Sequence, residues 1–420
     1  MAGRPQDRRA VWAWALYDWA NSAFATAVMA GFFPVFFREA WSAGAAEGVA
    51  TFRLGLANSA ASLAVAAAAP FLGALADAGG AKKRWLLGFA AAGIGGTAAL
   101  AGVPAGGWAW AAALYALATV GFMGANVFYD ALLVDVAEPA VRDRVSALGY
   151  ALGYLGGGLA FLGLLAAVLR PEALGLPGPG AAVRFAFVAV AAWWALFSAP
   201  LARWVREAPG ARGISWRAGA ARLRQTLGEV RNHGPALRFL LAYWLYMDGV
   251  DTVVRMAVDY GLALGLGAGD LMKALLVTQF VGFPAAVAYG RLGERIGPKA
   301  SILLGLGIYA GVTLWARGMS TPAEFYGLAV VIGLVQGGVQ ALSRSFFSRL
   351  VPPGRSAEFF GFYNLMGKFA AVIGPALMGA VGWWTGNPRD GVLAVTGLVV
   401  AGGIVLLGVP GAGEGRADAA

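Results

Sequence analysis

The feature of this sequence that most restricts its fold is a series of apolar stretches long enough to cross a lipid bilayer. About 20 predominantly apolar residues in a helix span the hydrocarbon core of a membrane. The 420 residues are 59% hydrophobic and only 13% charged, whereas a soluble domain carries about twice that share of charge. We therefore expect an all-α integral membrane protein with twelve transmembrane helices, near residues 11–37, 53–76, 85–103, 108–136, 145–169, 183–204, 236–262, 271–292, 300–317, 322–351, 357–384 and 391–410.

One long, arginine-rich segment divides these spans six and six. We predict an N-terminal six-helix bundle at residues 1–204, a cytoplasmic basic linker at 205–235, a C-terminal six-helix bundle at 236–410 and a cytoplasmic tail at 411–420. Within the linker, residues 216–230 have the pattern of an amphipathic helix on the membrane surface.

The distribution of cations predicts the orientation in the membrane. Of the 32 Lys and Arg residues, 22 fall in the termini and in alternate loops on one side, seven fall on the other side, and three lie within spans. Because cytoplasmic loops carry the excess of Lys and Arg, both termini are expected in the cytoplasm of a cell that holds this protein in its inner membrane. The net charge of +10 is thus explained by topology, and we expect no nucleic-acid partner.

A short loop pattern occurs twice, roughly half a chain apart. Its frame is Gly-x-Leu-small-acid-x-x-Gly-x-basic, formed by Gly73, Leu75, Asp77, Gly80 and Lys82 in one half and by Gly290, Leu292, Glu294, Gly297 and Lys299 in the other. Glycine adopts the backbone conformations of a tight turn without steric cost. A repeat of this kind predicts a duplicated membrane protein.

The repeated loop resembles the signature loop of the major facilitator superfamily, found after the second and the eighth helices. This resemblance implies two pseudo-symmetric six-helix bundles and a conformational latch made of ion pairs on the cytoplasmic side. The residues expected in the latch are Gly73, Asp77, Gly80, Lys82, Arg84, Asp135, Arg142, Gly290, Glu294 and Lys299.

Charged residues inside the predicted spans need a reason, since a charge at the bilayer centre costs about 2.5–3.5 kcal/mol on insertion scales. The first span places Asp18 and Asn21 three positions apart, and the seventh places Asp248 and Asp251 in the same way. Residues three or four apart share a helix face. The candidates for substrate binding or coupling are Asp18, Asn21, Asp130, Asp248, Asp251, Arg255, Gln336, Gln340, Arg344, Asn364 and Lys368.

The pairing of these charges is open at this stage. Arg255 follows Asp251 by four residues and precedes Asp259 by four, so pairs within the seventh span are possible. Asp248 then has no local partner, and Arg344 or Lys368 from later spans is available. The alternative for every group is a polar staple between helices that never touches a substrate. The glycines from Gly149 to Gly158 indicate close helix packing.

The first span narrows the resemblance. Residues 14–24, with the core Tyr17-Asp18-Trp19-Ala20-Asn21-Ser22, resemble the opening helix of one facilitator branch, and residues 129–137 and 340–346 agree. That branch contains bacterial transporters of unassigned substrate and the fungal vacuolar, autophagy-related amino-acid effluxers. The resemblance implies a transporter and suggests amino acids as substrates, although the longer loops of the fungal members are absent here.

The sequence therefore predicts a monomeric secondary transporter that moves a small solute by alternating access within membrane lipid. Protons are the expected coupling ion, and Asp130 or Asp248 the coupling group, because an apolar site disfavours a charged carboxylate. The alternatives are a carrier of sugars or drug-like cations, a receptor or lipid-handling protein on the same fold, and an intramembrane hydrolase.

No enzyme activity, cofactor or metal is expected. The chain has no Cys, and its single His, His233, lies in the predicted linker. No glycine-rich phosphate loop followed by Lys-Ser or Lys-Thr is found.

Overall fold

A computed structural model describes residues 7–46, 49–207, 216–229, 233–263, 267–369 and 373–410. Throughout these ranges the secondary structure is helical, with no strand. The N-terminal half contains α1 (Arg8–Ala23), α2 (Phe33–Phe36), α3 (Val49–Gly79), α4 (Lys82–Ala99), α5 (Trp108–Val136), α6 (Arg142–Leu169) and α7 (Pro179–Trp204). The C-terminal half contains α9 (Gly234–Ala263), α10 (Ala268–Ile296), α11 (Pro298–Gly318), α12 (Pro322–Leu350), α13 (Ser356–Phe369), α14 (Ile373–Thr385) and α15 (Gly391–Leu407). The helix α8 (Trp216–Glu229) lies between the halves in sequence.

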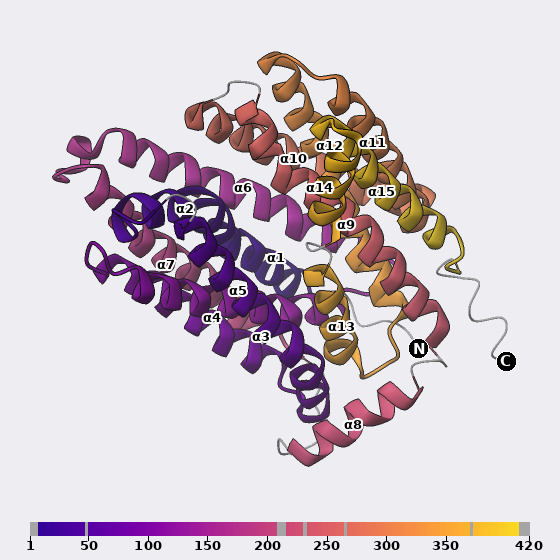
Figure 1. Cartoon of the computed structure of the whole chain (residues 1–420). Helices are drawn as coiled ribbons and strands as arrows, with labels where there is room; N and C mark the ends of the chain where they lie inside the picture. Colours follow the sequence, from indigo (N-terminus) through magenta and orange to yellow (C-terminus); the bar gives the residue numbers. More distant parts are fainter. Residues whose placement is uncertain are drawn as a thin grey trace, which may run out of the picture.

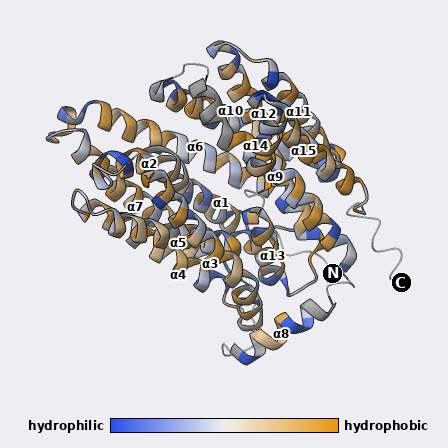
Figure 2. Ribbon diagram, viewed as in Figure 1, coloured by the Kyte–Doolittle hydropathy of each residue, from blue (hydrophilic) through white to orange (hydrophobic). Residues whose placement is uncertain are grey.

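Ten helical segments in the described ranges are long and apolar enough to cross a membrane. Two more complete the set: α9, which is long but carries the acids of the seventh predicted span, and α15, which is apolar but shorter. The result is a multi-pass membrane protein with the predicted twelve spans. Figure 2 shows hydrophobic residues along the helices and hydrophilic residues gathered near their ends and on α8.

The first span is longer and less regular than predicted. It continues from α1 through the π-helical segment Phe24–Phe32, the short α2 and a second π-helical segment, Phe37–Trp41. Aromatic rings hold this outer part in place: Phe33 stacks on Tyr115 at 3.9 Å between ring centroids, and Phe37 and Trp41 pack on Phe33 at 5.4 and 5.5 Å. The span therefore ends at Trp41 rather than at Phe37.

The two sets of helices lie beside each other and meet along a few helix pairs (Figure 1). Across the boundary, α6 packs on α10 and on α12, and α13 packs on α3 and on α5. Helix α8 packs against the end of α3. Gly73 allows one of these approaches, since a Cβ at this position would collide with the carbonyl group of Ala357 at the start of α13.

Candidate functional site

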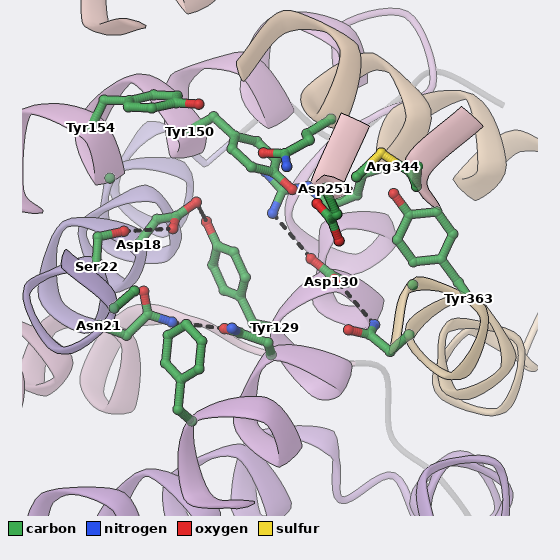
Figure 3. A pocket seen from close by; sticks show the side chains of 18 of the residues that line it. Asp18, Asn21, Ser22, Tyr129, Asp130, Tyr150, Tyr154, Asp251, Arg344 and Tyr363 are labelled. Carbon is green, nitrogen blue, oxygen red and sulfur yellow. Dashed lines mark hydrogen bonds and ion pairs between the residues drawn. The ribbon is translucent and has the colours of Figure 1, made fainter. Parts of the chain in front are cut away.

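A polar cavity of about 390 Å³ is lined by residues of both halves, and Figure 3 shows the side chains that surround it. Helices from both halves contribute to it: α1, α5 and α6 on one side and α9, α10, α12 and α13 on the other. Its polar lining consists of Asp18, Asn21, Ser22, Thr26, Asn126, Tyr129, Asp130, Tyr150, Tyr154, Tyr243, Asp251, Gln279, Gln340, Arg344, Tyr363, Asn364 and Lys368.

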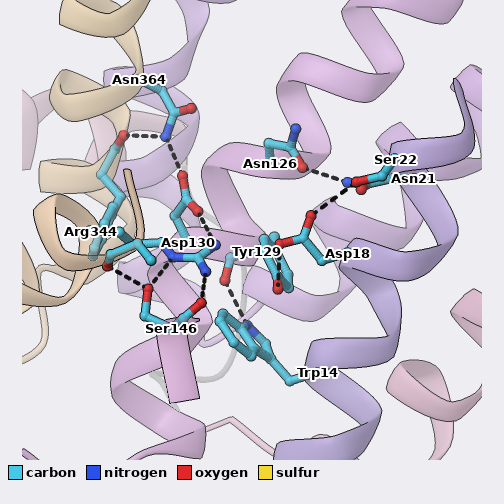
Figure 4. A network of polar contacts seen from close by, with 12 residues as sticks. Trp14, Asp18, Asn21, Ser22, Asn126, Tyr129, Asp130, Ser146, Arg344 and Asn364 are labelled. Atoms are coloured by element: carbon cyan, nitrogen blue, oxygen red, sulfur yellow. Dashed lines mark hydrogen bonds and ion pairs between the residues drawn. The ribbon is translucent and has the colours of Figure 1, made fainter. Parts of the chain in front are cut away.

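Arg344 of α12 is the cation at the floor of this cavity, and it is 1% exposed. Its Nη1 donates to Oδ1 of Asp130 at 3.1 Å. Its Nε and Nη2 donate to the hydroxyl and carbonyl oxygens of Ser146, both at 2.9 Å (Figure 4). A buried charge is tolerated when it is paired and its remaining donors are satisfied. Because Asp130 and Ser146 belong to α5 and α6, this cluster joins the two halves.

Aromatic rings surround the same guanidinium group. Its central carbon lies 4.5 Å from the ring centroid of Tyr150, 4.9 Å from that of Trp14 and 5.1 Å from that of Tyr129. Trp14 in turn stacks on Tyr129 and donates its indole N–H to the Tyr129 carbonyl oxygen at 2.9 Å. Cation–π contacts of this kind stabilise a desolvated cation. The rings therefore hold Arg344 between α1, α5 and α6.

Asp18 of α1 faces the same cluster from the other wall (Figure 4). Its carboxylate accepts hydrogen bonds from the hydroxyl of Tyr129 at 3.3 Å and from that of Ser22 at 3.4 Å. On the neighbouring face, Asn21 donates to the side-chain oxygen of Asn126 at 2.7 Å. Asp130 is held from the C-terminal half as well, because Asn364 of α13 donates to its second oxygen at 3.0 Å.

Two glycines of α6 make room for these polar groups. A Cβ at Gly149 would lie 2.6 Å from the Tyr129 hydroxyl and 3.1 Å from Nη2 of Arg344. A Cβ at Gly153 would lie 2.8 Å from the Ser22 hydroxyl and 2.9 Å from Oδ1 of Asp18. These glycines, expected to serve helix packing, thus also face the polar cluster.

Eight of the eleven predicted substrate or coupling residues line the cavity: Asp18, Asn21, Asp130, Asp251, Gln340, Arg344, Asn364 and Lys368. Three others are not among its lining residues. Gln336 lies on α12 one turn farther from Arg344 than Gln340 does. The side chain of Arg255 lies outside the described part of the chain.

Asp248 is the third, and our expectation that it lines the cavity is wrong. It is 1% exposed, and its Oδ1 accepts the backbone N–H of Gly374 at 2.9 Å. Three residues turn an α-helix by about 300°, so Asp248 and Asp251 point in directions about 60° apart. Asp251 faces the cavity, whereas Asp248 faces α14. Arg344, one of the cations considered for Asp248, pairs with Asp130 instead.

Several cavity residues were not predicted as site residues, among them Tyr150, Tyr154, Tyr363 and Gln279. Ser146, which accepts hydrogen bonds from Arg344 beside the cavity, was not predicted either. Gln279 of α10 donates to the Thr26 hydroxyl at 3.0 Å and so links the halves at the level of the cavity. One feature of the sequence could have indicated Ser146 as a site residue: it shares a face of α6 with Gly149 and Gly153, which contact the same polar cluster.

Below the cavity, toward the cation-rich ends of the helices, a second polar network joins the halves. Asp77 at the end of α3 accepts the backbone N–H groups of Ala357 and Glu358 at 3.1 and 2.9 Å, which caps the N-terminus of α13. Lys82 donates to Asp135 at 2.7 Å and to the Ser356 hydroxyl at 2.8 Å. The signature loop thus contacts the eleventh span directly.

The start of α6 makes matching contacts with the end of α12. Arg142 donates to the carbonyl oxygen of Ser348 at 3.2 Å. Asp143 pairs with Arg349 at 2.7 Å and also accepts the Ser345 hydroxyl. Asp143 was not predicted, because at the end of a span it has the pattern of an ordinary loop acid.

The second copy of the loop differs from the first. Gly290 packs closely on α6, where a Cβ would lie 2.6 Å from that of Ala147, but Glu294 is exposed, as is Arg84 in the first copy. Lys299 donates to the carbonyl oxygens of Leu407 and Val409 at the end of α15, at 2.8 and 2.7 Å.

Lys83, rather than Lys82, is the structural counterpart of Lys299. Lys83 donates to the carbonyl oxygens of Ala202 and Val205 at the end of α7, at 3.2 and 2.9 Å. Both lysines are the second residue of their helices and bind the C-terminus of the last span of their half. The repeated sequence pattern aligns Lys299 with Lys82. This alignment is wrong by one residue, because α4 begins one residue farther from the glycine of its loop than α11 does.

Glu207, just after α7, lies against the same loop. The backbone N–H groups of Lys82 and Lys83 at the N-terminus of α4 lie near its carboxyl group. Burial of this carboxyl group raises its pKa above the usual value. The N–H groups lower the pKa, but the effect of burial is larger.

The spans and the central cavity define the class of this protein: it is a membrane transporter with the major facilitator fold. Solved structures of such transporters agree in fold. The human organic anion transporter MFSD10 superposes with a TM-score of 0.74 at 18% identity, over 96% of this chain and 100% of that one. The transporter FucP in its outward conformation gives a TM-score of 0.70 at 13% identity, over 96% and 100%.

The chain belongs to the family described as "Vacuole effluxer Atg22 like", whose model matches residues 51–420. The MFS-type transporter YxiO of Bacillus subtilis, named as uncharacterized, is 38% identical over 405 residues, which are 94% of each chain. Autophagy-related protein 22 of Coccidioides immitis is 26% identical over 321 residues, 69% of this chain and 52% of that relative. The chain thus spans about half the length of this fungal relative. The resemblance seen in the sequence is confirmed, and the protein is a transporter rather than an enzyme.

Proposed function

We propose that this transporter carries amino acids by alternating access and couples their movement to protons. The observation that supports it most is the floor of the cavity, where Asp130 holds Arg344 and Asn364 from the other half. Loss of the charge on Asp130 would weaken one of the contacts that hold the two halves together. Proton binding and opening of the cavity would then be linked.

The charges around the cavity suit a zwitterion. Carboxylates of Asp18 and Asp251 and the cation of Lys368 line the same space. An amino acid presents one ammonium and one carboxylate group, each of which has an oppositely charged counterpart in this lining. The tyrosine hydroxyl groups and amides that complete the wall supply donors and acceptors for the rest of the solute.

The arrangement of contacts supports an outward-open state. The hydrogen bonds of Asp77, Lys82, Arg142 and Arg349 join the halves between the cavity and the cation-rich face. If that face is cytoplasmic, as the positive-inside rule favours, the cytoplasmic side is closed in this conformation. In this proposal both termini lie in the cytoplasm, and the contacts of Asp77 and Lys82 break when the transporter opens inward.

The test is flux of a labelled amino-acid mixture in proteoliposomes, with and without an imposed pH gradient. We expect gradient-driven flux in the wild type and its loss in Asp130→Asn. The matched control is Asp248→Asn, because an amide oxygen at this position can still accept the Gly374 N–H. Flux in Asp130→Asn equal to that of the wild type would contradict coupling through this residue. No flux of any amino acid in folded protein would contradict the proposed substrate class.

A further inference from the structure

The carboxylates of the central cavity differ in how their charge is compensated. Asp130 forms an ion pair with Arg344 at 3.1 Å. Asp18 forms no ion pair within the described residues, and its hydrogen-bond donors there are the hydroxyl groups of Tyr129 and Ser22. Neither donor carries a charge. The negative charge of Asp18 is therefore offset less directly than that of Asp130.

The two hydrogen bonds to Asp18 are also long. They measure 3.3 Å from the Tyr129 hydroxyl and 3.4 Å from the Ser22 hydroxyl, whereas bonds from a hydroxyl to a carboxylate are usually about 2.5–2.7 Å. A carboxylate away from bulk water is stabilised most by a nearby positive charge. Asp18 is half-buried and lines the cavity, so a cation in that space would supply the missing charge.

The wall beside Asp18 has no side chain at one position. Gly153 of α6 stands there, and a Cβ on it would lie 2.9 Å from Oδ1 of Asp18. Tyr150 and Tyr154, on either side of Gly153 in the sequence, line the cavity (Figure 3). Aromatic rings attract ammonium groups, and hydroxyl oxygens accept hydrogen bonds from them. The surroundings of Asp18 therefore suit a compact ammonium group.

The cations of the chain lie elsewhere in the cavity. Arg344 donates from Nη1 to Asp130 and from Nε and Nη2 to Ser146. Lys368, the other cation of the lining, belongs to α13 in the C-terminal half. The lining thus offers a site for a cation on α1 and a site for an anion on α13.

We propose that Asp18 is the subsite for a primary ammonium group, and that the carboxylate of the same solute is directed toward Lys368. The identity of the solute rests on the proposed function, whereas the subsite itself requires only a small ammonium compound. Such a group has three N–H donors, enough for the carboxylate of Asp18 and for neighbouring hydroxyl oxygens. A zwitterion bound in this way contacts both halves of the molecule, because α1 and α13 belong to different halves.

The test is thermal unfolding of the purified full chain in detergent, titrated with benzylammonium chloride. Benzyl alcohol is the neutral ligand of the same shape, and sodium chloride matches the ionic strength. A ligand that binds the folded state raises the unfolding temperature in a saturable way. We expect benzylammonium to do so in the wild type, and Asp18→Asn to weaken its apparent affinity at least about tenfold, since a hydrogen bond between two charged groups is lost.

Two variants keep the result specific. Asp18→Asn retains an acceptor and removes a charge without adding bulk, so we expect it to fold. Asp251→Asn removes another carboxylate of the cavity, and Asp248→Asn removes a buried carboxylate outside the lining. Both should bind benzylammonium as the wild type does. A loss of affinity in Asp251→Asn with none in Asp18→Asn would overturn the assignment.

Three further results would overturn the subsite: no stabilisation of the wild type by benzylammonium, equal stabilisation by benzyl alcohol, or an affinity unchanged in Asp18→Asn. The proposed function is tested separately by amino-acid flux. Benzylammonium binding that depends on Asp18, in a protein without amino-acid flux, would support the subsite and contradict only the amino-acid substrate. Amino-acid flux with benzylammonium binding independent of Asp18 would contradict only the subsite.

Discussion

Arg344 is the buried cation that connects the two halves of the molecule at the central cavity. It is a fully buried cation whose donors contact Asp130 and Ser146, and three aromatic rings surround it. An isolated charge at this depth would be costly, and its partners come from the other half of the chain. Arg344 therefore contributes both to the charge of the cavity and to the contact between the halves.

Arg344→Gln should lower stability by about 3 kcal/mol, because it leaves Asp130 buried without its cation. Adding Asp130→Asn should restore most of that loss, since no uncompensated charge then remains, but neither variant should transport. Thermal unfolding and proteoliposome flux are the two measurements. A double variant no more stable than the single one would show that Asp130 and Arg344 do not act as a pair.

Gly153 tests the fit between α6 and the polar cluster. Gly153→Ala places a methyl group against Asp18 and Ser22, and overpacking of this kind typically costs about 1–3 kcal/mol. We expect reduced flux as well as lower thermal stability. Gly163→Ala is the control on the same helix, because a Cβ there meets nothing within 4 Å. It should be neutral or stabilising by up to about 1 kcal/mol, and equal effects at both positions would contradict the account.

At the scale of elements, the contacts of the signature loop decide how the spans meet. Asp77 caps α13, Lys82 bridges Asp135 and Ser356, and Glu207 covers the start of α4. Three elements that are distant in sequence, namely the end of α3, the start of α13 and the segment after α7, converge at this loop.

Glu207 gives this loop a pH dependence whose sign can be derived. The pKa of Glu207 is higher in the folded than in the unfolded protein, so its protonated form stabilises the folded state. This stabilisation is lost as the pH rises from the pKa of the unfolded state through that of the folded state. Glu207→Gln should therefore be more stable than the wild type above this range, with the difference shrinking at lower pH. Thermal unfolding measured across pH checks this, and a difference independent of pH would contradict it.

The sequence was informative where burial is costly. Hydropathy predicted the spans, and the intramembrane charges predicted all five charged residues of the cavity lining, because Asp, Arg and Lys are rarely placed in a membrane without a partner. Tyr150 and Ser146 carry no comparable cost, so their positions were not diagnostic. Asp248 was misplaced because the rotation of α9 about its axis depends on packing. The π-helical turns after Ala23 also leave no distinct pattern in the sequence.

At the scale of the whole molecule, the proposed alternating access requires the two halves to rock about the central cavity. The polar network at the cation-rich ends of the helices joins the two halves here, and its weakening should let the other conformation appear. The loss of a helix cap such as Asp77 costs about 0.5–2 kcal/mol, enough to shift a two-state equilibrium several-fold. Because the chain contains no Cys, introduced pairs of spin labels report on this motion without background labelling.

The most direct test is a pair of distance measurements in Asp77→Ala and in the wild type. One pair of labels, at the exposed positions Ala140 and Pro353, reports on the cation-rich side, and another, at Ala105 and Ser320, reports on the opposite side. We expect Asp77→Ala to lengthen the first distance and shorten the second, as rocking of two halves requires. A first distance that lengthens while the second stays fixed would indicate local loosening of α13 and would contradict alternating access through this latch.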